Sequence, residues 1–188
     1  MYCQKCGKRF SNQKKYCPTC GFEPITAKVR LKKIWRVSLV EGRNPSNRYP
    51  TDCVVCESCM NYCSHVHEGS AVPALSRIIV DLSELEWMMQ HRKFSTIKRI
   101  VCQQCPGVAP CMAVCKVASA MYRDDKTGAV IINEDFCTNC RACEKVCPYD
   151  AVWFSESTEK MIKCDLCGGD PECVKVCPVN VLRYEKIA

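Results

Sequence analysis

The spacing of the cysteines constrains this chain more than any other feature. Sixteen of its 20 cysteines fall in four consecutive blocks. The first and third blocks have the spacing C-x2-C-x2-C-x3-C, and the second and fourth have C-x2-C-x5-C-x3-C. The block cysteines are Cys53, Cys56, Cys59 and Cys63; Cys102, Cys105, Cys111 and Cys115; Cys137, Cys140, Cys143 and Cys147; and Cys164, Cys167, Cys173 and Cys177.

These blocks predict iron–sulfur clusters. Three cysteines on one tight loop reach three corners of a cuboidal cluster, and the fourth, about one helical turn further on, points toward another cluster. We therefore expect four [4Fe-4S] clusters and single-electron transfer. A disulfide-stapled secreted domain is the alternative. The first residues hold no apolar run typical of a signal peptide, and no stretch has the roughly 20 apolar residues of a membrane helix. We expect a cytoplasmic protein with no membrane span.

Residues 1–24 predict a separate small metal site. Two C-x2-C knuckles, each followed by glycine, supply four thiolates in a pattern shared by zinc ribbons and rubredoxins. The stretch between the knuckles is short and polar, which favours structural zinc over a rubredoxin-type iron. The predicted ligands are Cys3, Cys6, Cys17 and Cys20.

The rest of the chain divides into a basic segment, 25–52, and a cluster-binding body, 53–188. The basic segment is either a solvated strand and linker or a docking strap for a partner. In the body, residue patterns predict a strand over 76–80 and a helix over 82–89. They also predict hairpins over 120–132 and 151–163, and a short helix over 142–146 before a fourth cysteine. This repetition indicates an α+β fold built around the clusters.

The formal charge overstates how basic the folded protein would be. It is +7, with a sequence pI of about 8.6, but it counts every cysteine as neutral. A [4Fe-4S] cluster held by four thiolates carries a charge of about −2. Four clusters and a zinc site would therefore leave the protein slightly negative. We expect much of the Lys and Arg surplus to balance buried anions, and we expect no nucleic-acid partner.

Four segments of the body carry a resemblance to a known family. They are 59–69 with 76–78, 102–105, 127–130 and 163–171. Together with the cysteine blocks, these segments resemble the four-cluster iron–sulfur subunits of the DMSO reductase and formate dehydrogenase type. The closest likeness is to subunits that accompany tungsten aldehyde oxidoreductases and class II benzoyl-CoA reductase-like complexes. The likeness covers about residues 50–186. Many relatives have proline after each fourth cysteine, whereas this chain has Ser64 and Lys116 at two of these positions.

The resemblance implies tandem bacterial-ferredoxin-like domains with nested ligand sharing. The second and third blocks would form an inner pair of clusters, and the first and fourth blocks an outer pair. The implied ligand sets are Cys53, Cys56, Cys59 and Cys177; Cys164, Cys167, Cys173 and Cys63; Cys102, Cys105, Cys111 and Cys147; and Cys137, Cys140, Cys143 and Cys115.

The resemblance also implies a non-catalytic electron-transfer subunit. It would relay electrons between a tungsten or molybdenum pterin catalytic subunit and a ferredoxin or a flavin/NAD-linked subunit. The sequence shows no nucleophile–base pair and no phosphate-binding glycine loop of its own. The alternatives are a free polyferredoxin and a redox-sensing nucleic-acid-binding regulator. His65 and His67 lie beside Cys63, where we expect them to be ordinary polar surface residues or to hydrogen-bond to sulfur, and not to bind metal.

Overall fold

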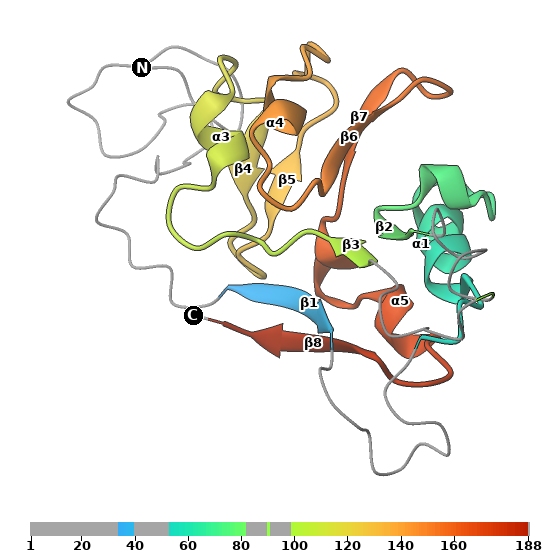
Figure 1. Cartoon of the computed structure of the whole chain (residues 1–188). Helices are drawn as coiled ribbons and strands as arrows, with labels where there is room; N and C mark the ends of the chain where they lie inside the picture. The colour runs from blue at the N-terminus through green and yellow to red at the C-terminus, as the bar shows by residue number, and fades with distance from the viewer. Residues whose placement is uncertain (1–33, 40–52, 82–89, 91–98, 188) are drawn as a thin grey trace.

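The computed structural model describes residues 34–39, 53–81, 90 and 99–187 (Figure 1). The described elements mix short helices with short strands, which confirms the expected α+β class. The helices are α1 (Ser58–Glu68), α3 (Pro110–Val114), α4 (Ala142–Lys145) and α5 (Glu172–Lys175), with 3-10 turns η1 (Pro73–Leu75) and η2 (Leu166–Gly169). The strands are β1 (Trp35–Leu39), β2 (Ile78–Val80), β3 (Arg99–Val101), β4 (Met121–Arg123), β5 (Val130–Ile132), β6 (Val152–Ser155), β7 (Lys160–Lys163) and β8 (Leu182–Lys186).

The described strands form four two-stranded antiparallel sheets, and two of these are the predicted hairpins. The turn between β4 and β5 shows why the first hairpin forms. The Asp124 carboxylate accepts hydrogen bonds from the Thr127 backbone N–H at 2.8 Å and from the Thr127 hydroxyl at 2.6 Å. Gly128 follows with a φ of 70°, a conformation that glycine adopts without steric cost.

The predicted strand over 76–80 is also present, but it begins two residues later. The Ser76 hydroxyl donates to the Ile78 carbonyl at 2.6 Å, so this serine bends the chain instead of joining the ladder. From Ile78 onward, β2 pairs with β3. The predicted helix over 82–89 and the whole of the predicted module 1–24 lie outside the described residues.

A helix carries the third cysteine of each block and leads toward the fourth, as expected. The helix of the first block, α1, is much longer than α4 or α5. It has 11 residues and continues past Cys63, whereas α4 and α5 have four residues each. Pro148 and Pro178 follow the fourth cysteines of the later blocks, and proline prevents a helix from continuing. In the first block Ser64 takes that place. It is fully buried, and its hydroxyl accepts a hydrogen bond from the Val72 N–H at 3.0 Å.

Strand β1 lies within the predicted basic segment and joins the C-terminal strand β8, side by side in Figure 1. Val37 is fully buried, so the strand is not a solvated connection. The Trp35 ring stacks on Tyr184 with 4.7 Å between ring centroids. The Trp35 backbone N–H donates to the Thr127 backbone carbonyl at 3.1 Å. The strand therefore connects the C-terminal end of the chain to the β4–β5 turn.

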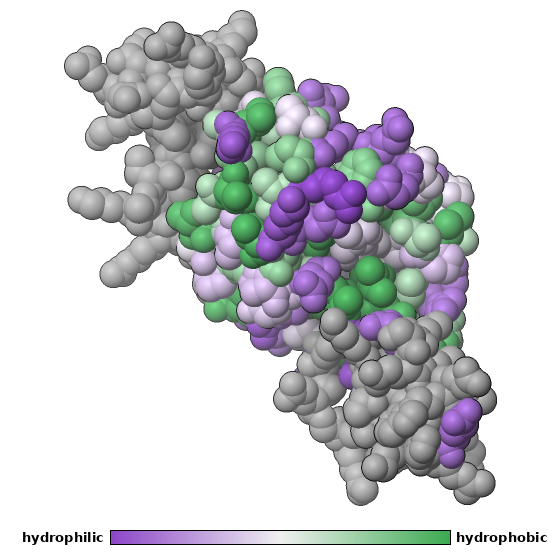
Figure 2. Space-filling model, turned by 45° about the horizontal axis from the view of Figure 1, so that its top comes forward, coloured by the Kyte–Doolittle hydropathy of each residue, from purple (hydrophilic) through white to green (hydrophobic). Residues whose placement is uncertain are grey.

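Cysteine sulfur is part of both main hydrophobic cores. In the larger core, Val37, Ile78, Val101 and Leu166 pack with Cys63, Cys102, Cys164, Cys173 and Cys177. In the smaller core, Met121, Val130, Val152 and Met161 pack with Cys111 and Cys143. The surface is more mixed. On the face in Figure 2, hydrophobic side chains lie in small groups among hydrophilic ones. The buried block cysteines thus occupy the interior where a small domain would otherwise place aliphatic side chains.

We predict that Val37→Ala lowers the free energy of unfolding by about 2 kcal/mol, because it removes two buried methyl groups and leaves a cavity beneath β1. The measurement is denaturant or thermal unfolding of the purified chain. Val108→Ala makes the same chemical change at a side chain that is 67% exposed, and it should change stability by less than about 0.5 kcal/mol. Equal effects of the two substitutions would contradict the packing of β1 described above.

Candidate metal centres

The structure gathers twelve of the block cysteines around three cavities, each lined by cysteines from two different blocks. One cavity is lined by Cys53, Cys56, Cys59 and Cys177. A second is lined by Cys102, Cys105, Cys111 and Cys147. A third is lined by Cys115, Cys137, Cys140 and Cys143. In every case three sulfurs come from one block and the fourth from another.

The four remaining block cysteines are also close together. Burial raises the pKa of the Cys173 thiol, and repulsion from Cys164, Cys63 and Cys167 raises it further. Such repulsion weakens as the distance between the two charged groups grows, so the three cysteines named lie near Cys173. Cys63, from the first block, therefore lies with three cysteines of the fourth block.

Each block has the same unusual backbone conformation just before its second cysteine. Val55, Gln104, Asn139 and Leu166 have φ values of 57°, 50°, 54° and 63°. Residues with side chains rarely adopt this left-handed region, and for a β-branched residue such as Val55 it is a clear outlier. Left-handed residues turn successive N–H groups toward one side and form a concave anion site of the kind that surrounds iron–sulfur clusters.

Several backbone N–H groups point at cysteine sulfurs. The Arg77 N–H lies 3.2 Å from the Cys63 Sγ, and the Ala151 N–H lies 3.3 Å from the Cys147 Sγ. These contacts stabilise negative charge on sulfur, as hydrogen bonds to the ligands of a cluster do.

The walls of the cavities are largely apolar, and this affects the thiols. Ile78, Val80 and Leu182 line the cavity of Cys59. Burial raises the pKa of Cys59 to about 12, with a further contribution from Cys53 and Cys177. Thiolates crowded into such a cavity need a compensating cation, and iron supplies one. Four convergent sulfurs, an apolar wall and inward N–H groups therefore fit a thiolate-ligated [4Fe-4S] cluster.

The four cysteine groups follow one another in series. Cys59 in the first group repels Cys173 in the next. Cys164 in that second group is raised in pKa by burial and then by Cys102, which belongs to the third group. Cys143, in the last group, has a pKa raised to about 11 by burial and then by Cys111 in the third group. The middle junction is buried at Cys102 and Cys164.

Each of the two end groups contains one cysteine that is exposed at the surface. Cys56 belongs to the first group and Cys140 to the last, and these are the two exposed cysteines among the block cysteines. The series therefore begins and ends at positions that a partner molecule can approach.

A polar network lies against Cys63 and includes one of the two predicted histidines. His67 Nδ1 lies 2.7 Å from the Cys63 carbonyl oxygen and 3.8 Å from its Sγ, and His67 Nε2 lies 3.0 Å from the Asp165 carboxylate. Arg77 donates to the same carboxylate at 2.9 Å. Burial alone would lower the pKa of His67, but hydrogen bonds to Asp165, Cys167 and Cys63 raise it to about 12.

This arrangement favours hydrogen bonding by His67 over metal ligation. Ligand atoms of His67, Asp165 and Cys167 do lie within 4.8 Å of one another. However, the Arg77 guanidinium already pairs with the Asp165 carboxylate, and a metal cation there would be repelled. His65 is exposed on α1.

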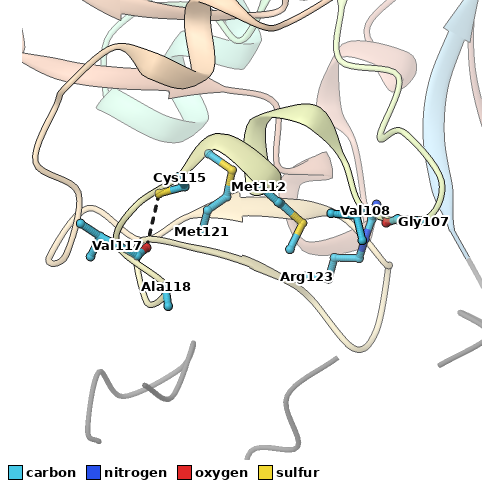
Figure 3. Close-up of a pocket in the computed structure, with 8 residues that line it drawn as sticks. All are labelled: Gly107, Val108, Met112, Cys115, Val117, Ala118, Met121 and Arg123. Carbon is cyan, nitrogen blue, oxygen red and sulfur yellow. Dashed lines mark hydrogen bonds between the residues drawn. The ribbon is translucent and has the colours of Figure 1, made fainter. Parts of the chain in front are cut away.

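A buried arginine fixes the loop that contains Cys105. Arg123 is 2% exposed and donates to the carbonyls of Gly128 and Gly107, each at 2.7 Å, and to the carbonyl of Cys105. Figure 3 shows Arg123 at one end of a surface hollow of about 170 Å³ and Cys115 at the other. Because its fork-shaped head satisfies three carbonyls at once, Arg123 holds the five-residue gap of the second block in place.

Sequence reasoning did not single out several residues that position these cysteines. Asp165 and Lys163 flank Cys164, so their place in the chain was the signal that could have found them. Gln104 lies inside a C-x2-C pair, which is a similar signal. Arg123 lies in a predicted hairpin strand and carried no signal at all. The predicted zinc ligands Cys3, Cys6, Cys17 and Cys20 lie outside the described residues.

Comparison with known proteins finds relatives in several oxidoreductase systems. The polyferredoxin-like subunit of an aliphatic sulfonate oxidoreductase from Pyrococcus furiosus is 36% identical over 127 residues, which is 65% of each chain. Protein NrfC of Escherichia coli is 34% identical over 116 residues, or 61% of this chain and 49% of NrfC. Formate hydrogenlyase subunit 2 of Escherichia coli is 36% identical over 107 residues, or 57% and 46%. The chain thus spans between about half and two thirds of these relatives.

Among the helices described, none is both long and apolar enough to cross a membrane.

The family comparison identifies the class of domain. The 4Fe-4S dicluster domain family matches residues 94–187, a range that includes the second, third and fourth cysteine blocks. This match confirms the expected ferredoxin-type iron–sulfur domain, and the chain belongs to the 4Fe-4S dicluster domain family.

Proposed function

We propose that this chain is an electron-transfer subunit that carries four [4Fe-4S] clusters. The observation that carries the proposal is the series of four cysteine groups with a buried middle junction and exposed ends at Cys56 and Cys140. A protein that only stored or sensed redox state would need one accessible cluster. Four sites in series, with access at both ends, suit passage of electrons through the protein.

The proposed ligand sets are the four cysteine groups described above, which follow the nested order implied by the family resemblance. A [4Fe-4S] cluster exchanges one electron at a time. The chain's own residues would hold each cluster by four thiolates, exclude water with apolar walls and stabilise the sulfur charge through N–H groups such as that of Arg77. No residue of the chain is assigned a role in substrate chemistry.

The partners are proposed from the relatives and the resemblance together. Two of the relatives are subunits of a sulfonate oxidoreductase and of formate hydrogenlyase. We propose a catalytic oxidoreductase subunit as one partner, specifically one with a tungsten or molybdenum pterin, and a ferredoxin or flavin/NAD-linked subunit as the other. The location proposed is the cytoplasm.

Residues 1–24 are proposed to form a structural zinc ribbon, 25–52 a basic connecting segment, and 53–188 the cluster-binding body. The basic segment would include β1, which attaches it to the body through β8. The Arg36 side chain pairs with Glu185 at 2.8 Å, so this one arginine of the segment has an ionic partner within the chain.

The metal content tests the number of sites. Anaerobically purified protein should contain about sixteen iron atoms and about one zinc atom per chain, as four cubes and one four-thiolate zinc site require. Metal analysis with acid-labile sulfide determination measures both. About eight iron atoms per chain would contradict the four-cluster proposal. An extra high-spin ferric signal in place of zinc would mean that the ribbon is a rubredoxin-like centre.

A pair of serine substitutions within the third block tests the nested ligand sets. Cys147→Ser should damage the cluster held by Cys102, Cys105 and Cys111, because Cys147 lines that cavity. Cys143→Ser is the matched control and should damage the cluster of Cys137 and its neighbours instead. Cluster-resolved paramagnetic resonance of the two reduced variants would distinguish the sites. Loss of the same cluster in both variants would refute the nested scheme.

A further inference from the structure

A buried lysine stands at the junction between the two middle cysteine groups. Lys163 ends β7 and is 4% exposed. In Figure 1, β7 ends at the centre of the molecule, between the half that contains α3 and α4 and the half that contains α1 and α5. Lysine is almost never fully buried unless its charge has a partner. The position of Lys163 therefore needs a physical explanation.

The ammonium group is held by three neutral oxygens. Lys163 Nζ donates to the Val130 carbonyl at 2.5 Å, to the Cys164 carbonyl at 2.9 Å and to the Gln104 amide oxygen at 3.3 Å. Three acceptors match the three protons of a charged lysine. Within the described part of the chain, its hydrogen bonds include none to a carboxylate. The positive charge is therefore solvated by dipoles but not cancelled by an acid.

Gln104 sets the position of this lysine. It is fully buried between two cysteines of the second block. Its Nε2 donates to the Cys164 carbonyl at 2.9 Å, and its Oε1 accepts from the Val130 N–H at 2.9 Å. Gln104 thus ties the second block to the start of the fourth block, with the ammonium of Lys163 between them.

The charge of Lys163 acts on sulfurs of both middle groups. The side chain lines the same cavity as Cys102, Cys105, Cys111 and Cys147. On its other side, the ammonium donates to the carbonyl of Cys164, which follows Lys163 in the chain and belongs to the second group. One fixed cation therefore faces negative charge on two sides.

We propose that Lys163, positioned by Gln104, couples the two middle clusters electrostatically. The inference rests on the proposed function. A positive charge between two sites stabilises an added electron on either one, so it raises the reduction potentials of both. In the transfer step one reduced cluster loses one electron and its oxidised neighbour gains it. The proposed step moves one electron only, and no covalent bond is formed or broken.

The test is a redox titration of the full chain, with each cluster followed by paramagnetic resonance and the iron content measured alongside. Lys163→Gln removes the charge but keeps hydrogen-bonding capacity. We expect full iron content. Two of the four midpoint potentials should fall by about 59 mV, which corresponds to a tenfold change in the equilibrium constant for one-electron reduction. Lys163→Arg keeps the charge and should leave all four potentials near those of the wild type.

Lys160→Gln is the matched surface control. Lys160 begins the same strand, its side chain is 49% exposed, and it pairs with Glu134 at 2.7 Å. Its removal deletes the same formal charge where solvent screens it, so no potential should shift. Unchanged potentials in an iron-replete Lys163→Gln variant would overturn the proposal. Equal shifts in the Lys160→Gln variant would overturn it as well.

Gln104→Glu covers the case in which Lys163→Gln fails to assemble. It places a carboxylate against the ammonium while nearly conserving volume, and it should lower the same two potentials. If both neutralising variants lost iron and Lys163→Arg retained it, the lysine would have only a structural role and the proposal would fall. The proposed function fails separately, since it would be contradicted by wild-type protein with fewer than four clusters.

Discussion

Burial of negative charge on sulfur is the constraint on which this structure depends. Cysteine side chains belong to both main cores, next to aliphatic residues such as Val37 and Leu166. A thiolate in an apolar interior is strongly disfavoured unless something compensates its charge. The chain provides three kinds of compensation. They are sites where convergent sulfurs can bind iron, backbone N–H groups turned inward by left-handed residues, and buried cationic side chains. The short helices and hairpins serve mainly to hold these groups in place.

The buried cations change how the net charge of +7 is to be understood. Arg123 is 2% exposed and Lys163 is 4% exposed, while the Arg77 side chain is 15% exposed. Each lies beside a cysteine group or the loop that forms one. Their charges are therefore directed at the interior and are not available to a partner at the surface. This agrees with the expectation, made from composition, that part of the basic surplus balances buried anions.

Local patterns were predictable from the sequence, and non-local packing was not. The β4–β5 hairpin follows from Asp124 and Gly128, which specify their turn within five residues. The C-x2-C spacings likewise specify tight loops. The pairing of β1 with β8 could not be predicted, because alternating apolar residues state that a strand exists but not which distant strand it joins. The left-handed residues before the second cysteine of each block were equally hidden, since none of these four is glycine. Lys163 was missed because lysine is ordinarily an exposed residue, which outweighed the signal of its place beside Cys164.

The contacts are nested along the chain, and this nesting favours one order in which they form. Cys115 joins the third block across the shortest span, Cys147 joins the second block across the next, and Cys63 joins the fourth block across a longer one. Cys53 then meets Cys177, and β1 pairs with β8 outside them all. Each contact encloses the one before it, so closing an inner pair shortens the effective loop that the next pair must close. The entropic cost of closing a loop grows only slowly with loop length, but it is still larger when the enclosed segment has not yet folded. We therefore expect the inner half of the body to form first, and β1 and β8 to complete a structure whose metal sites are already assembled.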